Sequence, residues 1–126
     1  MPTELITWLY VENVSRSASF YREGLGLRPI LQQGDCVVLG LSETAFLGLC
    51  QRAEPRETPG LLLCFVDEDV EGRVAQLVAA GAVLEQAPAD NPRYGIVHAF
   101  LRDPDGHRVE VQRFHDANWK APGPDA

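Results

Sequence analysis

The feature that most constrains this chain is a repeated order of secondary-structure elements. The second copy starts 56 residues after the first, so that Asn13 aligns with Asp69, and each is a suitable N-cap for the helical pattern that follows it. In each copy an apolar strand precedes the cap, and three short strands follow the helix. The predicted strands are 5–11, 28–32, 36–41, 45–51, 61–66, 83–86, 96–102 and 107–114, and the predicted helices are 14–23 and 70–80. Such a repeat indicates two copies of one βαβββ unit.

Each predicted unit has one helix and a sheet with one apolar face, and these faces must be buried together. The sequence therefore predicts an α+β fold whose two βαβββ modules form a curved mixed sheet, with the helices on the convex face and a cup-shaped cleft on the other. We expect a single domain over 1–114, made of module one (1–51), a connector (52–59) and module two (60–114). Residues 115–126 are expected to form a flexible C-terminal tail, in which Trp119 is either docked over a cleft or disordered.

The most informative local motif is the Asp-Pro-Asp-Gly turn at 103–106, between the last two predicted strands. Its proline presets φ, and its glycine can adopt the positive φ that closes the turn. In the strand that follows, alternation places Glu110 and Gln112 on one face and Val109 and Val111 on the other. A carboxylate is thereby held in mid-strand beside an apolar layer, where a site can form.

Charge and cysteine content exclude several classes of protein. The net charge of −7 argues against a nucleic-acid partner, because phosphate binding needs clusters of Lys and Arg that this chain lacks. No apolar run approaches the roughly 18 residues of a membrane span, and residues 1–4 lack the basic region of a secretory signal. We therefore expect a cytoplasmic protein without membrane contact. Cys36, Cys50 and Cys64 are odd in number and widely spaced, so the sequence predicts neither a disulfide framework nor a paired-cysteine metal site, only small apolar thiols.

Two motifs resemble a known family. Residues 11–27 (Val-Glu-Asn-Val-Ser-Arg-Ser-Ala-Ser-Phe-Tyr-Arg-Glu-Gly-Leu-Gly-Leu) are similar to the first-module signature of the vicinal oxygen chelate superfamily, which includes glyoxalase I, extradiol dioxygenases, and fosfomycin and bleomycin resistance proteins. Residues 100–111 (Phe-Leu-Arg-Asp-Pro-Asp-Gly-His-Arg-Val-Glu-Val) are similar to its closing hairpin. The resemblance covers about residues 4–114. It implies paired βαβββ modules, usually in a homodimer whose clefts involve both modules, and leaves the chemistry open because one fold hosts several activities.

The resemblance also implies where metal-dependent members hold their ion. The corresponding positions here are Ile6, Gly48, Leu62 and Glu110, and only Glu110 can be a ligand. A catalytic divalent ion needs about three protein ligands. The chain is therefore closest in character to the metal-free, bleomycin-resistance-like members, for which no cofactor is expected.

The alternation of side chains along each strand predicts which residues line the cup. Trp8 and Tyr10 share one face of the first strand and can stack on a planar or cationic ligand. Glu110 can form an ion pair with a positive group of that ligand. The predicted ligand-binding residues are Trp8, Tyr10, Cys64, Tyr94, His98, Glu110 and Gln112. Alternatively, Trp8 and Tyr10 belong to the core or to a dimer interface, and Glu110 is salt-bridged to Arg102 or Arg108. His107, beside the turn, is expected to be solvated.

Together these features predict a metal-independent protein that sequesters a small aromatic or polar organic molecule, such as an antibiotic, in the cleft of a homodimer. The chain has no nucleophile elbow and no Gly-rich phosphate loop, so no catalytic residue is assigned and an enzyme is not favoured. The alternative is a metal-dependent lyase, isomerase or dioxygenase. Its one divalent ion would be held by an atypical ligand set that includes Glu110 and His98, for which Cys64 is the only candidate third ligand, with Glu110 as the catalytic residue. A third hypothesis is a binding or regulatory module with no antibiotic role.

Overall fold

The computed structural model describes all residues except 55–57 and 122–126. Each of two sheets has four strands, in the orders β1-β4-β3-β2 and β5-β8-β7-β6, and in each sheet the first and last strands of the unit pair in parallel. The elements are β1 (Leu5–Val11), α1 (Val14–Leu25), β2 (Arg28–Gln33), β3 (Cys36–Gly40), β4 (Ala45–Gln51), β5 (Leu63–Val66), α2 (Val70–Ala79), β6 (Val83–Asn91), β7 (Ile96–Arg102) and β8 (Arg108–Phe114). The predicted α+β fold of two βαβββ modules is confirmed; sheet A belongs to module one and sheet B to module two.

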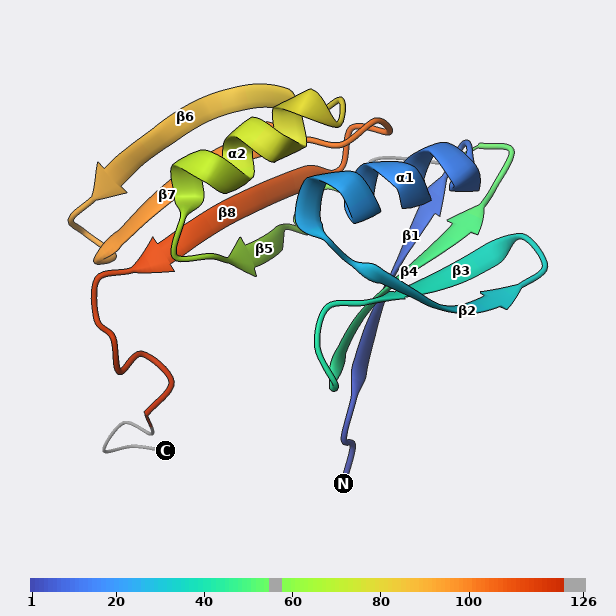
Figure 1. The fold of residues 1–126 in the computed structure, drawn as a ribbon, viewed down its shortest axis with the longest axis horizontal. Helices are drawn as coiled ribbons and strands as arrows, with labels where there is room; N and C mark the ends of the chain where they lie inside the picture. Colours follow the sequence, from blue (N-terminus) through green and yellow to red (C-terminus); the bar gives the residue numbers. More distant parts are fainter. Residues whose placement is uncertain (55–57, 122–126) are drawn as a thin grey trace.

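The two helices form one layer above both sheets, and the sheets extend away from it on either side (Figure 1). The helices meet closely at Gly24, where an added Cβ would lie 2.8 Å from Leu77 Cδ2. Residues from both modules, among them Leu9, Tyr21, Leu77 and Val111, belong to one buried apolar cluster. Burial of this cluster is the main force that joins the modules, because the hydrophobic contribution grows with the apolar area removed from water.

Local signals place both helices as the sequence predicts. The Asn13 side chain accepts a hydrogen bond from the backbone N–H of Arg16 at 3.0 Å, and the Asp69 side chain accepts one from Gly72 at 2.9 Å. Gly26 ends α1 in the left-handed conformation, with φ of 73°. Among the described residues, neither helix is long and apolar enough to cross a membrane.

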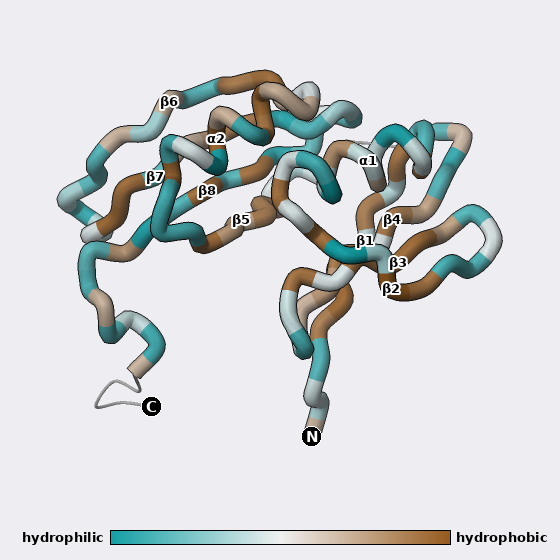
Figure 2. The backbone as a smooth tube through the Cα atoms, in the orientation of Figure 1, coloured by the Kyte–Doolittle hydropathy of each residue, from teal (hydrophilic) through white to brown (hydrophobic). Residues whose placement is uncertain are grey.

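Strand patterning is equally visible in the chain. Figure 2 shows the β2–β3 hairpin as apolar along its strands and hydrophilic at its tip. Strand β6 extends to Asn91, beyond the predicted end at residue 86, although it contains Pro88. A proline is tolerated there because β6 is an edge strand, and its pairing with β7 shifts register between Gln86 and Ala89.

The turn at 103–107, which we call the docking turn, belongs to module two and contacts module one. The Asp105 carboxylate accepts hydrogen bonds from the Glu12 backbone N–H at 2.9 Å and from the Ser17 hydroxyl at 3.1 Å. It also pairs with the Arg16 guanidinium at 3.3 Å. Asp105 therefore accepts from the backbone just before the Asn13 N-cap and from a hydroxyl in the first turn of α1, at the helix end where negative charge is favourable.

Deeper in the docking turn, the Tyr21 hydroxyl donates to the Asp103 carboxylate at 2.6 Å, and both side chains are buried. His107 is also buried, so the expectation that it is solvated is wrong. Its Nε2 lies 3.1 Å from the Tyr10 carbonyl oxygen, and since a carbonyl only accepts, Nε2 carries the proton. Nδ1 has no hydrogen-bond partner among the described residues. Local sequence does not reveal this burial, because the covering strand belongs to module one.

The C-terminal tail is described as far as Ala121. The His115 backbone N–H donates to Gly95 at 2.8 Å, and the Trp119 ring stacks on Phe114 with centroids 4.4 Å apart. The Trp119 ring is thus placed on Phe114 at the end of β8, and its docking over a cleft stays a prediction. The rest of the predicted flexible tail, residues 122–126, lies outside the described residues, as do residues 55–57 of the connector.

Candidate functional site

A row of polar side chains crosses sheet B on the face away from the helices. Cys64 and Glu110 are register partners on β5 and β8, and the His98 Nδ1 atom lies 2.6 Å from the Glu110 carboxylate. Asn91, on the edge strand β6, lies 3.5 Å from His98 Nε2. In a neutral His98, Nδ1 donates to Glu110 while Nε2 accepts from the Asn91 amide. The row exists because strand order β5-β8-β7-β6 places these four side chains in sequence across the sheet.

The Cys64 thiol is held in its neutral form. Cys64 is exposed, but partial desolvation, followed by the charge of Glu110 and a hydrogen bond to it, raises its pKa to about 12. A thiol rather than a thiolate therefore faces Glu110 at neutral pH and can donate to its carboxylate. A neutral thiol is a poor nucleophile and a poor metal ligand, since both roles need the thiolate.

A second site-like feature lies on sheet A. A cavity of about 470 Å³, which we call the sheet A cavity, is lined by Trp8, Tyr10, Gln33, Cys36, Cys50 and Arg52. The Arg52 guanidinium lies 4.7 Å from the centre of the Tyr10 ring, in a cation–π arrangement. Trp8 lies flat over Gly48, its register partner on β4, and a Cβ at position 48 would be 2.2 Å from the Trp8 ring. The Trp8 indole can lie against β4 because Gly48 has no side chain.

Cys36 and Cys50, which line this cavity, form a disulfide. The prediction that all three cysteines are free is therefore wrong for this pair; Cys64 is free. The two cysteines are register partners on β3 and β4, with Cα atoms 4.1 Å apart. Cysteine number and spacing do not reveal such a bond, because it depends on the register between two strands.

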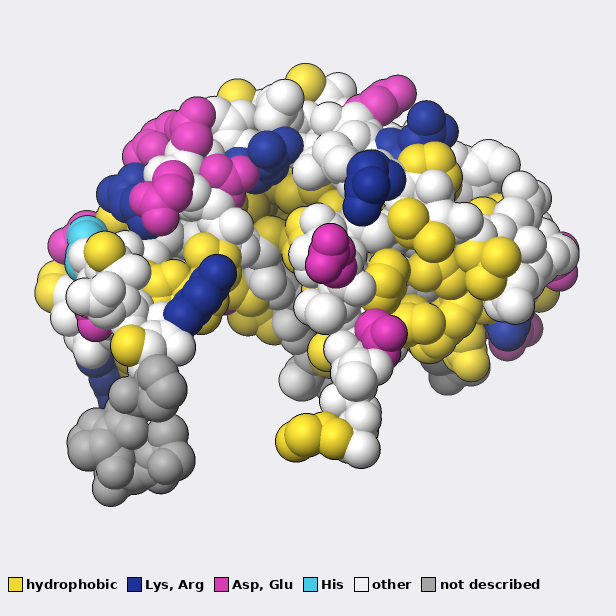
Figure 3. Space-filling model, turned by 60° about the horizontal axis from the view of Figure 1, so that its bottom comes forward, with side chains coloured by type: hydrophobic (Ala, Val, Ile, Leu, Met, Phe, Trp, Pro, Cys, Tyr) yellow, Lys and Arg dark blue, Asp and Glu magenta, His cyan; other side chains and the backbone are white. Residues whose placement is uncertain are grey.

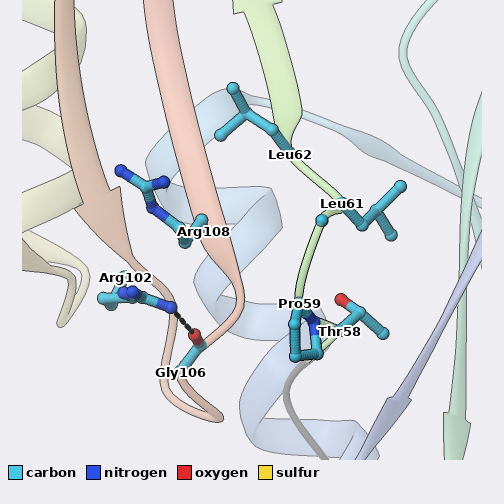
Figure 4. A pocket seen from close by; sticks show the side chains of 8 residues that line it. Thr58, Pro59, Leu61, Leu62, Arg102, Gly106 and Arg108 are labelled. Atoms are coloured by element: carbon cyan, nitrogen blue, oxygen red, sulfur yellow. Dashed lines mark hydrogen bonds between the residues drawn. The ribbon is translucent and has the colours of Figure 1, made fainter.

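A recess of about 420 Å³ opens where the connector approaches the β7–β8 hairpin (Figure 4), and it is lined by Thr58, Pro59, Gly60, Leu61, Leu62, Arg102, Gly106 and Arg108. Arg102 donates to the Gly106 carbonyl at 2.8 Å. The Nε atoms of Arg102 and Arg108 lie 2.9 Å and 3.7 Å from the same Glu85 carboxylate oxygen. Glu110 instead pairs with His98, so the alternative in which Glu110 is salt-bridged to Arg102 or Arg108 is wrong.

The structure brings the predicted site residues together in two groups. Cys64, His98 and Glu110 form the row on sheet B, with Gln112 opposite His98 in the β7–β8 register. Trp8 and Tyr10 line the sheet A cavity, whose walls come from module one and from Arg52 of the connector. Tyr94 lies in the turn between β6 and β7, is 64% exposed, and has the Arg93 guanidinium 5.3 Å from its ring.

Module one also exposes many apolar side chains. Ile6, Trp8, Tyr10, Ile30, Leu31 and Leu41 are between 41% and 54% exposed. Figure 3 shows hydrophobic side chains gathered over module one and a hollow between the two modules. Contiguous exposed apolar surface of this kind marks an interaction site in a soluble protein.

Comparison with known proteins identifies the family of the chain. A family model described as Glyoxalase/Bleomycin resistance protein/Dioxygenase superfamily matches residues 5–111. The chain belongs to this superfamily. No curated protein matches the chain.

Solved structures of the superfamily share the fold. A glyoxalase/bleomycin resistance protein/dioxygenase family enzyme from Burkholderia phytofirmans PsJN is 20% identical, with a TM-score of 0.76 over 86% of this chain and 95% of that one. A glyoxalase-related enzyme from Fulvimarina pelagi is 21% identical, with a TM-score of 0.77 over 90% and 88% of the two chains. An E144Q mutant of glyoxalase I from Zea mays is 22% identical, with a TM-score of 0.73 over 86% of this chain and 45% of the maize chain.

The positions at which metal-dependent superfamily members are expected to hold their ion differ here in chemistry. Ile6 is apolar, Leu62 is apolar, and Gly48 lies beneath the Trp8 ring. Glu110 has His98 as its neighbour, but within residues 1–54 and 58–121 no group of three or more His, Cys, Asp or Glu side chains is arranged to hold a metal ion. This donor set does not fit a catalytic divalent ion bound by one copy of the chain.

Besides the disulfide cysteines, three residues of these surfaces were not predicted from the sequence. Gln33 and Arg52 line the sheet A cavity, and Asn91 extends the row on sheet B. Arg52 directly follows β4, which pairs in parallel with β1. A prediction of that strand pairing would have placed Arg52 near Tyr10. Asn91 carried no such signal, because strand β6 was expected to end at residue 86.

Proposed function

We propose that this superfamily member binds a small, planar organic molecule without a metal ion, in a cleft completed by a second copy of the chain. The observation that carries the proposal is the position of Trp8, whose indole covers Gly48. An acidic ligand side chain at position 48 is incompatible with this ring, and the ring itself offers an aromatic surface that is 41% exposed. The site is thus better suited to stacking than to coordination.

Sheet A supplies the contacts for a planar ligand. Tyr10 is 54% exposed beside Trp8, and Arg52 lies over its ring. Exposed aromatic rings next to a guanidinium are favourable surfaces for a flat, conjugated molecule. A volume of about 470 Å³ lies within the range of small-molecule sites.

Sheet B supplies polar anchors. The Glu110 carboxylate is only 7% exposed and is already bonded to His98, so an additional ligand donor meets an oriented acceptor. Arg108 and Glu110 lie on the same face of β8, so this surface presents both charges. The proposal therefore rests on stacking and hydrogen bonding, and it assigns no net charge to the ligand.

A homodimer completes the proposed cleft. The sheet A cavity takes its walls from module one and from Arg52 of the connector, and the polar row belongs to module two, so one chain offers two incomplete surfaces. Exposed apolar residues on module one, such as Ile30 and Leu31, favour burial against a second copy. The net charge of −7 favours a protein that does not bind nucleic acid. A cytoplasmic location stays a prediction.

Ligand titration tests this function. The Trp119→Phe variant leaves Trp8 as the sole tryptophan, and its fluorescence is recorded against a panel of glycopeptide and other aromatic drugs. We expect saturable quenching by at least one compound. Tyr10→Ala is expected to weaken that binding by about 1–2 kcal/mol, roughly 5- to 30-fold, because stacking area is lost. A panel with no saturable response contradicts the proposal.

Elemental analysis separates this function from the metal-dependent lyase, isomerase or dioxygenase. Protein purified without chelator is expected to hold no stoichiometric Zn, Ni, Mn or Fe, and Glu110→Gln is expected to leave the metal content unchanged. Stoichiometric metal that is lost in Glu110→Gln would establish the enzyme instead.

A further inference from the structure

We propose that the Cys36–Cys50 disulfide is a site of thiol–disulfide exchange with low-molecular-weight thiols, reached through the sheet A cavity. Both cysteines line that cavity, together with Arg52. Cys36 is partly exposed, whereas Cys50 is 6% exposed. This inference goes beyond ligand binding, since it needs only the cavity, the disulfide and a thiol.

The bond can open without unfolding the module. Cys36 and Cys50 are already opposite each other in the antiparallel β3–β4 ladder, where Val37 pairs with Leu49 and Val38 with Gly48. The Gln51 backbone N–H also donates to the Asp35 carbonyl at 3.0 Å, directly beyond the disulfide. These contacts persist when the sulfur–sulfur bond is broken, so the reduced and oxidised proteins share one fold.

Accessibility fixes the order of the reaction. A small thiolate attacks the Sγ of Cys36, the more exposed sulfur, and forms a mixed disulfide; the Cys36–Cys50 bond breaks, and its electron pair leaves on Cys50 as a thiolate that takes a proton from water. A second small thiolate attacks the sulfur of the bound small thiol and releases Cys36, which is protonated in turn. Two small thiols are oxidised to one disulfide, and the protein disulfide is reduced to two thiols.

Arg52 stabilises both thiolates of this reaction, the one that attacks and the one that leaves. Its guanidinium lines the same cavity and is permanently charged, so it attracts the incoming thiolate and stabilises the thiolate that leaves. The free thiol of Cys64 does not compete as an attacking group, because it belongs to sheet B and its pKa is raised to about 12. In a reducing compartment the glutathione pool would supply the small thiol.

Thiol counting in the folded protein tests the exchange. The Cys64→Ser variant removes the free cysteine, so aerobically purified protein is expected to show no reactive thiol. After incubation with reduced glutathione, without denaturant, we expect intact mass spectrometry to show one glutathione on Cys36 and then the dithiol form, with an unchanged circular dichroism spectrum. Two thiols that appear only after addition of urea overturn the proposal. The proposal is also overturned if the purified protein has two free thiols and oxidised glutathione fails to convert them to the disulfide.

Charge substitutions test the role of Arg52. In the Cys64→Ser background, Arg52→Gln is expected to slow reduction by glutathione about 3- to 10-fold at low salt, with a smaller difference at about 1 M salt because the charge is screened. Arg93→Gln is the matched control, since Arg93 also lies over a tyrosine ring but in the β6–β7 turn. Equal rates for Arg52→Gln and Arg93→Gln, or an adduct on Cys50 rather than Cys36, overturn this account of the site.

Discussion

The buried hydrogen bond between Tyr21 and Asp103 gives a sharp test of how the modules are held together. Tyr21→Phe removes one hydroxyl and keeps the ring, at a position where the side chain is fully buried and the carboxylate is 3% exposed. The hydroxyl donates to Asp103 Oδ2 at 2.6 Å, whereas Oδ1 accepts from the backbone N–H groups of Asp105 and His107. Loss of a hydrogen bond to a charged group costs about 2 kcal/mol. For a chain of this length that corresponds to a fall in Tm of about 8 °C.

The cost of Tyr21→Phe is expected to depend on pH. Burial raises the pKa of Asp103 above its usual value of 3.8, while the hydrogen bond from Tyr21 and the proximity of His107 work in the opposite direction. A carboxyl whose folded pKa is raised contributes its full stability below pH 3.8, and that contribution is lost as the pH rises through the folded pKa. Without the Tyr21 hydroxyl the pKa of Asp103 rises further, so the variant loses additional stability only above pH 3.8.

Urea denaturation between pH 3 and pH 8 measures this dependence. We expect a cost of about 1 kcal/mol at pH 3, where a neutral hydrogen bond is lost, and about 2 kcal/mol at pH 7. Tyr94→Phe is the control, because Tyr94 is exposed and lies outside the docking turn. A cost below about 0.5 kcal/mol at pH 7, or the same cost at pH 3 and pH 7, would refute the assigned role of the bond.

Three further substitutions probe separate parts of the structure. Gly48→Ala is expected to displace the Trp8 ring and to cost about 1–3 kcal/mol in urea denaturation, with altered Trp8 fluorescence; an unchanged spectrum and stability would contradict the close packing. Asp105→Ala is expected to cost about 1–2 kcal/mol because the Glu12 backbone N–H and the Ser17 hydroxyl lose their acceptor, and a stability equal to the wild type would exclude this role. Alkylation of Cys64 by iodoacetamide is expected to be slow at pH 8 and faster in Glu110→Gln, because Glu110 raises the pKa of that thiol; equal rates would rule out this coupling.

The fold was predictable because its signals are local and repeated. Caps at Asn13 and Asp69 fix both helix starts, and the predicted bounds of the strands at 5–11, 45–51 and 96–102 agree with the structure. The end of β6 was missed because Pro88 reads as a strand terminator unless the strand is known to lie at a sheet edge. Edge position is a property of the whole sheet, and a single strand does not encode it.

The site was less predictable because it depends on register and on contacts between modules. The register that pairs Gly40 with Phe46 also pairs Cys36 with Cys50, so the disulfide becomes visible only when the β3–β4 hairpin is placed. The partner of Glu110 is likewise decided by the pairing of β7 with β8. Alternation within one strand identified Glu110 as a candidate, but it did not choose among the cationic side chains that could reach it.

The hydrogen bond between His107 and Tyr10 has a consequence for recognition. Tyr10 presents its ring to the sheet A cavity, while its carbonyl oxygen is held by a buried imidazole from the other module. Under the proposed binding function, this aromatic wall is held in place before a ligand binds, so no interaction energy of the ligand is needed to order the strand. Selectivity at such a wall comes from the shape and electronics of the incoming ring system, since a rigid surface cannot adapt to a poor match.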